Sequence, residues 1–220
     1  MFRIFKIQNK RSDMDNRQIQ KKQILESTVS FLQTQGAPLP SYAQIADTGD
    51  LSRQLIRYYF NDPDDLMCEV CDLLAEAYRM ALVKGVETLE GQKRLDFIFD
   101  FYFDLVDEVR KPRDDQSYDA VMSFATGSDR IKTNLRGQYS LVGQLLQLEL
   151  KMQHPTLSLD DCAEISYLFV TLMYGHWKMV ATLGLSEEHK MVSRRAIDRI
   201  VASYVNNDLP KLAAVRVWQT

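Results

Sequence analysis

Apolar residues recur at helical spacing along nearly the whole chain. Leu66, Val70, Leu73 and Ala77, for example, fall on one face of a helix, and no stretch alternates apolar and polar residues as a half-buried strand would. Glycine and proline are sparse and mark the breaks. The pattern predicts an all-α protein of about nine helices, over residues 15–35, 42–48, 53–59, 63–89, 92–110, 116–125, 129–153, 159–183 and 187–206.

Start signals precede several of these segments. Ser41, Ser52 and Ser158 stand at N-cap positions, where a hydroxyl accepts a hydrogen bond from the first helical turn. Asp62 stands just before Pro63, a residue that suits the first position of a helix. These signals predict where the short N-terminal helices and two of the longer ones begin.

Residues 41–60 have the pattern of a helix-turn-helix. Ile45 and Ala46 on the first helix are spaced to pack against Ile56 on the second, and Gly49 or Asp50 can supply the left-handed residue of the turn. In such a motif the start of the second helix faces the edges of DNA bases. The polar residues expected there are Ser52, Arg53, Gln54 and Arg57.

A wider set of residues surrounds this motif: Ile24-Leu25-Glu26, Phe31, Gly36, Ser41, Ile45-Ala46, Leu51-Ser52-Arg53, Ile56 to Phe60, Asp62 and Leu66. The set covers about residues 17–70 and resembles the N-terminal domain of the TetR (tetracycline repressor) family. The resemblance implies a three-helix, helix-turn-helix DNA-binding domain followed by a helical bundle for ligand binding and dimerisation. We therefore expect a flexible basic arm over 1–14, the DNA-binding domain over 15–62 and the ligand-binding and dimerisation domain over 63–220.

The resemblance further implies a homodimeric, ligand-responsive repressor that places residues 52–59 of each subunit in the major groove of a palindromic operator. Carried over by position, Arg53 would read bases, and Gln54 and Tyr42 are further candidates. Phosphate contacts are expected from Ser41, Ser52, Tyr58 and Tyr59. For both tyrosines, packing within the domain is the alternative interpretation.

Two positions depart from the family pattern. The turn glycine is shifted by one residue, so that Asp50 places a negative charge near the expected DNA surface. Pro63 stands where the family commonly has a phosphate-binding lysine. Both departures indicate weaker non-specific affinity for DNA. A basic N-terminal segment could compensate by following the DNA backbone, the alternative being a solvated tail: Arg3, Lys6, Lys10, Arg11, Arg17, Lys21 and Lys22.

Charge is unevenly distributed along the chain. Residues 1–60 contain nine Lys or Arg and five Asp or Glu, a balance of +4, whereas the remaining residues carry −7. A basic first quarter favours a local surface for a polyanion. The start of the sequence does not have the pattern of a signal peptide, and no run of about 18 apolar residues occurs. We therefore expect a cytoplasmic protein.

Metal, cofactor and catalytic signals are weak. Cys68 and Cys71 form a C-x-x-C without the second pair that a zinc site would need, so buried packing is the expected role and a thiol-based sensor the alternative. The three histidines are scattered, and no phosphate loop, nucleophile elbow or telling carboxylate pair occurs. The sequence therefore predicts no metal, no cofactor and no enzymatic activity.

Two further residue sets are predicted for the C-terminal part. A pocket for an unknown small-molecule effector could be lined by Phe97, Phe101, Tyr102, Met122, Phe124, Tyr139, Tyr167, Tyr174 and His176, although such a stripe is more often plain core. A four-helix dimer interface could be formed by exposed residues of the last two helices, namely Leu168, Leu172, Val192, Ile197, Val201 and Tyr204.

A rival function belongs to a different class. Asp50, Pro63 and the acidic C-terminal part are also compatible with a helical small-molecule-binding or adaptor protein that has lost DNA binding. Steep dependence of binding on salt would distinguish a DNA reader from this alternative.

Overall fold

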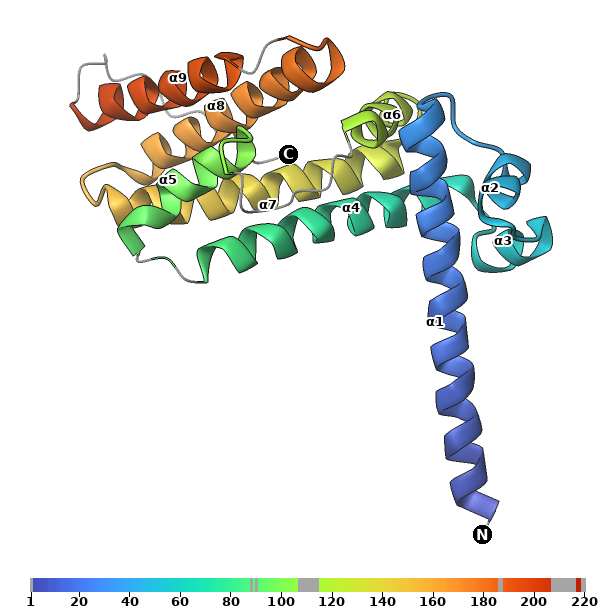
Figure 1. Cartoon of the computed structure of the whole chain (residues 1–220). Coiled ribbons are helices and arrows are strands. Elements are labelled where there is room, and N and C mark those ends of the chain that lie inside the picture. Colours follow the sequence, from blue (N-terminus) through green and yellow to red (C-terminus); the bar gives the residue numbers. More distant parts are fainter. Residues whose placement is uncertain are drawn as a thin grey trace. The chain divides into compact units, whose positions relative to one another are not determined.

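A computed structural model describes residues 2–87, 89, 91–106, 115–185, 188–206 and 217–218 (Figure 1). Its α-helices are α1 (Phe2–Gln35), α2 (Tyr42–Gly49), α3 (Arg53–Tyr59), α4 (Pro63–Val86), α5 (Gly91–Tyr102), α6 (Asp115–Ala125), α7 (Asp129–Gln153), α8 (Leu159–Trp177) and α9 (Glu188–Val205). A π-helical segment, Lys178–Thr182, continues α8. These residues contain nine α-helices and no strand, which confirms the predicted all-α class.

The chain forms two compact units. Unit 1 comprises Met1–Leu74 and Gln116–Asn134, and unit 2 comprises Ala75–Asp115 and Leu135–Thr220. Unit 1 therefore holds the predicted helix-turn-helix together with the start of α4, most of α6 and the start of α7. Helices α4 and α7 each contribute to both units.

Helix α1 begins much earlier than the sequence predicts. Neither proline nor glycine interrupts residues 2–35, and the structure continues the helix back to Phe2 through the segment expected to be a flexible arm. Whether residues 1–14 are flexible in solution stays a prediction. From Asn16 to Gln20 the side chains are exposed, and from Asn16 onward the first buried position of α1 is Ile24.

The core of unit 1 fixes the helix-turn-helix against α1. Ile24 and Leu32 of α1 are fully buried, as are Ile45 of α2 and Ile56 of α3, and Phe60 is 2% exposed. Burial of each such side chain is worth about 1.5–3 kcal/mol. Because α2 and α3 each contribute to this core, their orientation relative to α1 within unit 1 is set by packing rather than by the short turn alone.

Gly49 is required by this packing. A Cβ atom at Gly49 would lie 1.9 Å from the Ser27 hydroxyl oxygen and 2.8 Å from the Ser27 Cβ on α1. The left-handed turn residue is instead Asp50, with φ of 51° and ψ of 45°. The shifted glycine therefore has a physical reason, since α2 crosses α1 at Gly49 while aspartate tolerates the left-handed conformation at the next position.

Unit 2 is organised around an aromatic core. Phe169 of α8 stacks on Phe99 at 5.0 Å between ring centroids and meets Phe103 edge-on at 5.4 Å. The indole N–H of Trp177 donates to the carbonyl oxygen of Tyr102 at 2.9 Å. Aromatic pairs of this kind add about 0.5–1.5 kcal/mol beyond their buried area. They hold α5 and α8 together inside unit 2.

Two predicted helices end earlier than expected. α5 ends at Tyr102 rather than near 110, because Asp104 has a φ of 58° and the N–H of Leu105 donates to the Asp100 carbonyl in a closing turn. Residues 107–114 lie outside the described part. α8 was predicted to run to 183, but α-helical hydrogen bonding stops at Trp177 and a π-helical turn covers the rest before Gly184, whose φ is 69°.

Candidate nucleic-acid interface

Both helices of the helix-turn-helix, α2 and α3, begin at a serine N-cap. The Ser41 side chain accepts from the Gln44 N–H while the Gln44 side chain accepts from the Ser41 N–H, forming a capping box at α2. Ser52 accepts from the Leu55 N–H at 3.1 Å at the start of α3. These bonds satisfy backbone donors, and they confirm the cap positions predicted from the sequence.

One face of α3 is exposed to solvent. Arg53, Gln54, Arg57 and Tyr58 are exposed, and Tyr58 is 67% exposed, whereas Ile56 on the opposite side is buried. Residues spaced by three to four positions share one face of a helix. Arg53 and Arg57 are four positions apart, as are Gln54 and Tyr58, so the predicted base-reading candidates Arg53 and Gln54 belong to an exposed surface that also includes Arg57 and Tyr58.

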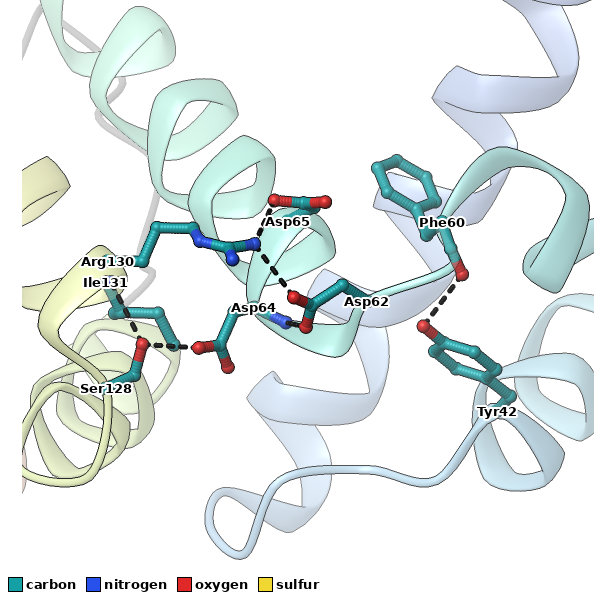
Figure 2. Close-up of polar contacts among 8 residues, drawn as sticks. All are labelled: Tyr42, Phe60, Asp62, Asp64, Asp65, Ser128, Arg130 and Ile131. Carbon is teal, nitrogen blue, oxygen red and sulfur yellow. Dashed lines mark hydrogen bonds and ion pairs between the residues drawn. The ribbon is translucent and has the colours of Figure 1, made fainter.

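Three tyrosines have internal partners. The half-buried Tyr42 donates its hydroxyl to the Phe60 carbonyl oxygen at 2.8 Å, and burial raises its pKa (Figure 2). The Tyr59 hydroxyl donates to the Gln20 side chain at 2.9 Å, and the Tyr58 hydroxyl accepts from Arg17 at 3.1 Å. Packing, the alternative interpretation, therefore has direct support for Tyr59, and Tyr42 ties the start of α2 to the end of α3.

Arg17 and Gln20 extend the same surface from α1. The Arg17–Tyr58 and Gln20–Tyr59 contacts join positions about 40 residues apart in sequence. The sequence placed Arg17 in a general basic segment but gave no signal for Gln20. Not every cation of that segment is available, because Lys21 forms an ion pair with Glu69 of α4 at 2.7 Å.

A charged cluster, which we call the α4 cap cluster, lies at the start of α4: Asp62, Asp64, Asp65, Ser128 and Arg130 (Figure 2). Asp62 Oδ1 accepts from the Asp64 N–H at 2.9 Å, as expected for the predicted cap. Asp62 Oδ2 accepts from the Arg130 guanidinium at 2.9 Å. That guanidinium also pairs with Asp65. Ser128 donates to Asp64 at 2.6 Å.

Contacts within the cluster favour the ionised states of Asp62 and Arg130. The Asp64 N–H lowers the pKa of Asp62, and nearby Arg130 lowers it further. The hydrogen bond to Asp65 raises the pKa of Arg130. The roles of Arg130 and Ser128 could not be predicted from the sequence, because these residues lie more than 60 positions from their partners and no local pattern marks such a contact.

The predicted pocket residues are divided between the two units, and that they line a pocket stays a prediction. Met122 and Phe124 belong to unit 1, whereas the others belong to unit 2. Within unit 2, Phe101 and Tyr102 are buried and meet edge-on at 5.2 Å, and the buried His176 lies 5.3 Å from the Phe103 ring. Tyr167 is 44% exposed and packs against Trp218. The remaining predicted residues, Phe97, Tyr139 and Tyr174, are half-buried in unit 2.

The predicted dimer residues divide into two groups. Val192 is 53% exposed, and Leu168, Leu172 and Tyr204 are half-buried. Ile197 and Val201 are 0% and 8% exposed, so the prediction that they are exposed is wrong. Because α9 packs along α8, Ile197 and Val201 are buried in the core of unit 2. Other apolar residues in or beside α8 and α9 are exposed, namely Leu159, Leu183, Leu185, Met191 and Val205.

The two α4 cysteines have the character of packing residues. Cys71 is fully buried, and burial raises the pKa of its thiol to about 12; the half-buried Cys68 also has a raised pKa, chiefly from burial. Since the thiolate is the reactive form, neither environment activates sulfur. Among the described residues, no group of three His, Cys, Asp or Glu side chains could hold a metal ion.

Alkylation will check this assignment. In the folded protein at about pH 8, Cys71 should stay unmodified by iodoacetamide while an unhindered small thiol reacts completely. In denaturant all three cysteines should react, and mass spectrometry of digested protein identifies each site. Modification of Cys71 in the folded protein at the rate of the free thiol would instead support the sensor interpretation.

Within the described residues, none of the helices combines the length and apolar character needed to cross a membrane. No protein-family model matches the sequence, and no curated protein matches it significantly. Solved structures do match its fold. A TetR transcription regulator from Haloarcula marismortui is 19% identical with a TM-score of 0.71, and the match covers 85% of this chain and 98% of that one.

Two other solved structures are similar to this chain at lower identity. A transcriptional regulator from Rhodococcus sp. is 12% identical with a TM-score of 0.67, covering 87% of this chain and 99% of that one. A candidate transcriptional regulator from Saccharomonospora viridis, solved in complex with choline, is 15% identical with a TM-score of 0.66, covering 83% and 95%. The chain therefore has the fold of a TetR transcription regulator.

Proposed function

We propose that this protein is a TetR-family transcriptional regulator that binds DNA sequence-specifically as a homodimer. The observation that carries the proposal is the open face of α3, where Arg53, Gln54 and Arg57 follow a capped helix start. The similarity of fold to solved transcription regulators supports it. A two-fold dimer would present two such faces to the two half-sites of a palindromic operator.

In this proposal, α3 enters the major groove with its N-terminus toward the bases. Arg53 donates a pair of hydrogen bonds to guanine, and Gln54 pairs with adenine. Ser41, Ser52, Arg57 and Tyr58 contact the flanking backbone, and Arg17 places a cation beside Tyr58 in support of such a contact. Tyr42 and Tyr59 contribute mainly through their internal hydrogen bonds, which fix the helices that carry the contacts.

We further propose that a small molecule bound by unit 2 regulates DNA binding, with repression relieved on binding. The aromatic side chains that pack around Phe169 and Trp177 are the apolar residues we expect to line its binding pocket. The complex of the Saccharomonospora viridis protein with choline supports a small-molecule effector as a class. Such a ligand acts by binding one conformation of the dimer more tightly than the other.

Selection of bound fragments from a random DNA pool tests the proposal. At about 0.15 M salt, the wild-type protein should enrich a single motif with two-fold symmetry. Sequencing of successive rounds gives the motif and its half-site spacing. Absence of any enriched sequence, with only weak binding at lower salt, would contradict sequence-specific recognition.

The rival is an adaptor or small-molecule-binding protein without DNA binding, and the acidic residues of the α4 cap cluster are the observation in its favour. Salt titration separates the two functions. A DNA reader loses affinity linearly in log–log coordinates with a slope near −0.9 for each phosphate neutralised, about −5 or steeper for a dimer with six contacts. A slope near zero, with no saturable binding, would favour the adaptor.

A further inference from the structure

The α4 cap cluster brings three carboxylates close to the candidate recognition helix. Only Phe60, Asn61 and Asp62 separate the end of α3 from the start of α4. Within unit 1, the Tyr42 hydroxyl donates a hydrogen bond to the Phe60 carbonyl oxygen in this short link between α3 and α4 (Figure 2). A DNA backbone that receives α3 would therefore pass near Asp62, Asp64 and Asp65. Their charges oppose it, because like charges at close range repel even in water.

Arg130 forms ion pairs with two of these carboxylates. It comes from the second residue of α7, and its guanidinium contacts both Asp62 and Asp65. Ser128 donates to the third carboxylate, Asp64, and its hydroxyl oxygen also accepts from the Ile131 N–H at 3.2 Å, which caps the start of α7. Ser128 and Arg130, at the start of α7, thus contact all three acidic side chains at the start of α4.

We infer that Arg130 is a positioning residue for DNA binding, an intramolecular counter-ion that lets the acidic start of α4 approach the phosphate backbone. The inference rests on the proposed function. It gives the contact a role beyond stability, since the side chains of Arg130, Asp62 and Asp65 are 52%, 44% and 56% exposed, and exposed ion pairs add little to folding. Their charges nevertheless act on any phosphate within about one Debye length.

The arrangement also makes the charge next to α3 depend on the α6–α7 turn. When Arg130 pairs with Asp62 and Asp65, the guanidinium and the two carboxylates together carry one net negative charge. When Arg130 is withdrawn, the two carboxylates carry two negative charges. A displacement of the turn that withdraws Arg130 therefore weakens DNA binding without altering the base-reading face of α3. Arg130 would thus influence the affinity for DNA, whereas Arg53 and Gln54 would determine which base sequence is bound.

Charge-removal variants test this role on the selected operator. Arg130→Gln should weaken binding by the dimer about 3- to 10-fold at low salt, and the difference should shrink as salt rises. The matched control is Arg79→Gln, which breaks the exposed Arg79–Glu76 pair. Arg79 belongs to unit 2 and contacts none of the three acidic side chains, so its replacement should change affinity less than about twofold.

Neutralising the acidic partners separates charge from structure. Asp62→Asn with Asp65→Asn, added to Arg130→Gln, should restore affinity to the wild-type level or above, because these three positions then carry no charge instead of one net negative charge. The fold should be kept, because asparagine still caps α4. The motif selected by Arg130→Gln should match that of the wild type. Unchanged affinity in Arg130→Gln, or a loss that the neutral partners do not restore, would overturn the inference. If the wild type selects no DNA, the proposed function fails first, and this inference falls with it.

Discussion

Replacement of Arg53 by alanine is expected to abolish most sequence discrimination. A bidentate contact from arginine to guanine is worth about 1–3 kcal/mol of discrimination, and a dimer loses it in both half-sites. The exposed Arg53 side chain supports no core contact, so the free energy of unfolding should stay within about 0.5 kcal/mol of the wild-type value. Loss of binding would then report the missing base contact rather than a damaged fold.

The measurement is the affinity for the selected operator and for a mixed-sequence duplex of equal length. Arg53→Ala should bind the operator little better than the mixed duplex, whereas the exposed arginine control Arg79→Ala should keep the wild-type ratio. An Arg53→Ala protein that discriminates as well as the wild type would remove this side chain from base recognition and leave Gln54 as the principal candidate.

Replacement of Gly49 by alanine is expected to destabilise unit 1. The new Cβ would lie 1.9 Å from the Ser27 hydroxyl oxygen and 2.8 Å from its Cβ. Rotation of the hydroxyl would relieve the first contact at the cost of its hydrogen bond to the Gln23 carbonyl, but the second contact requires α1 and α2 to separate. Overpacking of this kind costs about 1–3 kcal/mol.

Gly137→Ala is the matched control. Gly137 is also helical and exposed, and a Cβ there would meet nothing within 4 Å. Its replacement should stabilise the protein by about 0.5–1 kcal/mol, because alanine is the better helix former. Hydrogen exchange of the α1 and α2 amides reports the stability of unit 1 directly. Protection in Gly49→Ala equal to that in the wild type would show that α1 and α2 do not cross as closely as described.

Local chemistry explains why most helix starts could be predicted. The caps at Ser41, Ser52 and Ser158 each use a hydrogen bond within three residues, so their signals are contained in a short stretch of sequence. The bounds of α7 agree with the expected 129–153 for a similar reason, since breaks flank it on both sides. The recognition-helix face also follows from periodicity alone, because buried Ile56 fixes which side of α3 is outward.

Tertiary contacts explain what could not be predicted. The sequence predicts Ile197 and Val201 of α9 as exposed residues of a dimer interface, but both are buried, because apolar periodicity does not say whether α8 or a second subunit covers an apolar stripe. Likewise, no local pattern links Arg130 to Asp62 across 68 positions. The glycine of the turn looked displaced in sequence, and only the position of Ser27 shows that close approach to α1, rather than φ, requires it.

The most direct test of sequence reading by α3 compares the wild type with Arg53→Ala on operators in which each guanine in turn is replaced by 7-deazaguanine, which lacks the N7 acceptor. At one guanine of each half-site, the substitution should weaken wild-type binding by about fivefold or more and leave the affinity of Arg53→Ala unchanged. Equal effects of every substitution on both proteins, or no effect on either, would contradict a contact between Arg53 and guanine and with it the proposed mode of recognition.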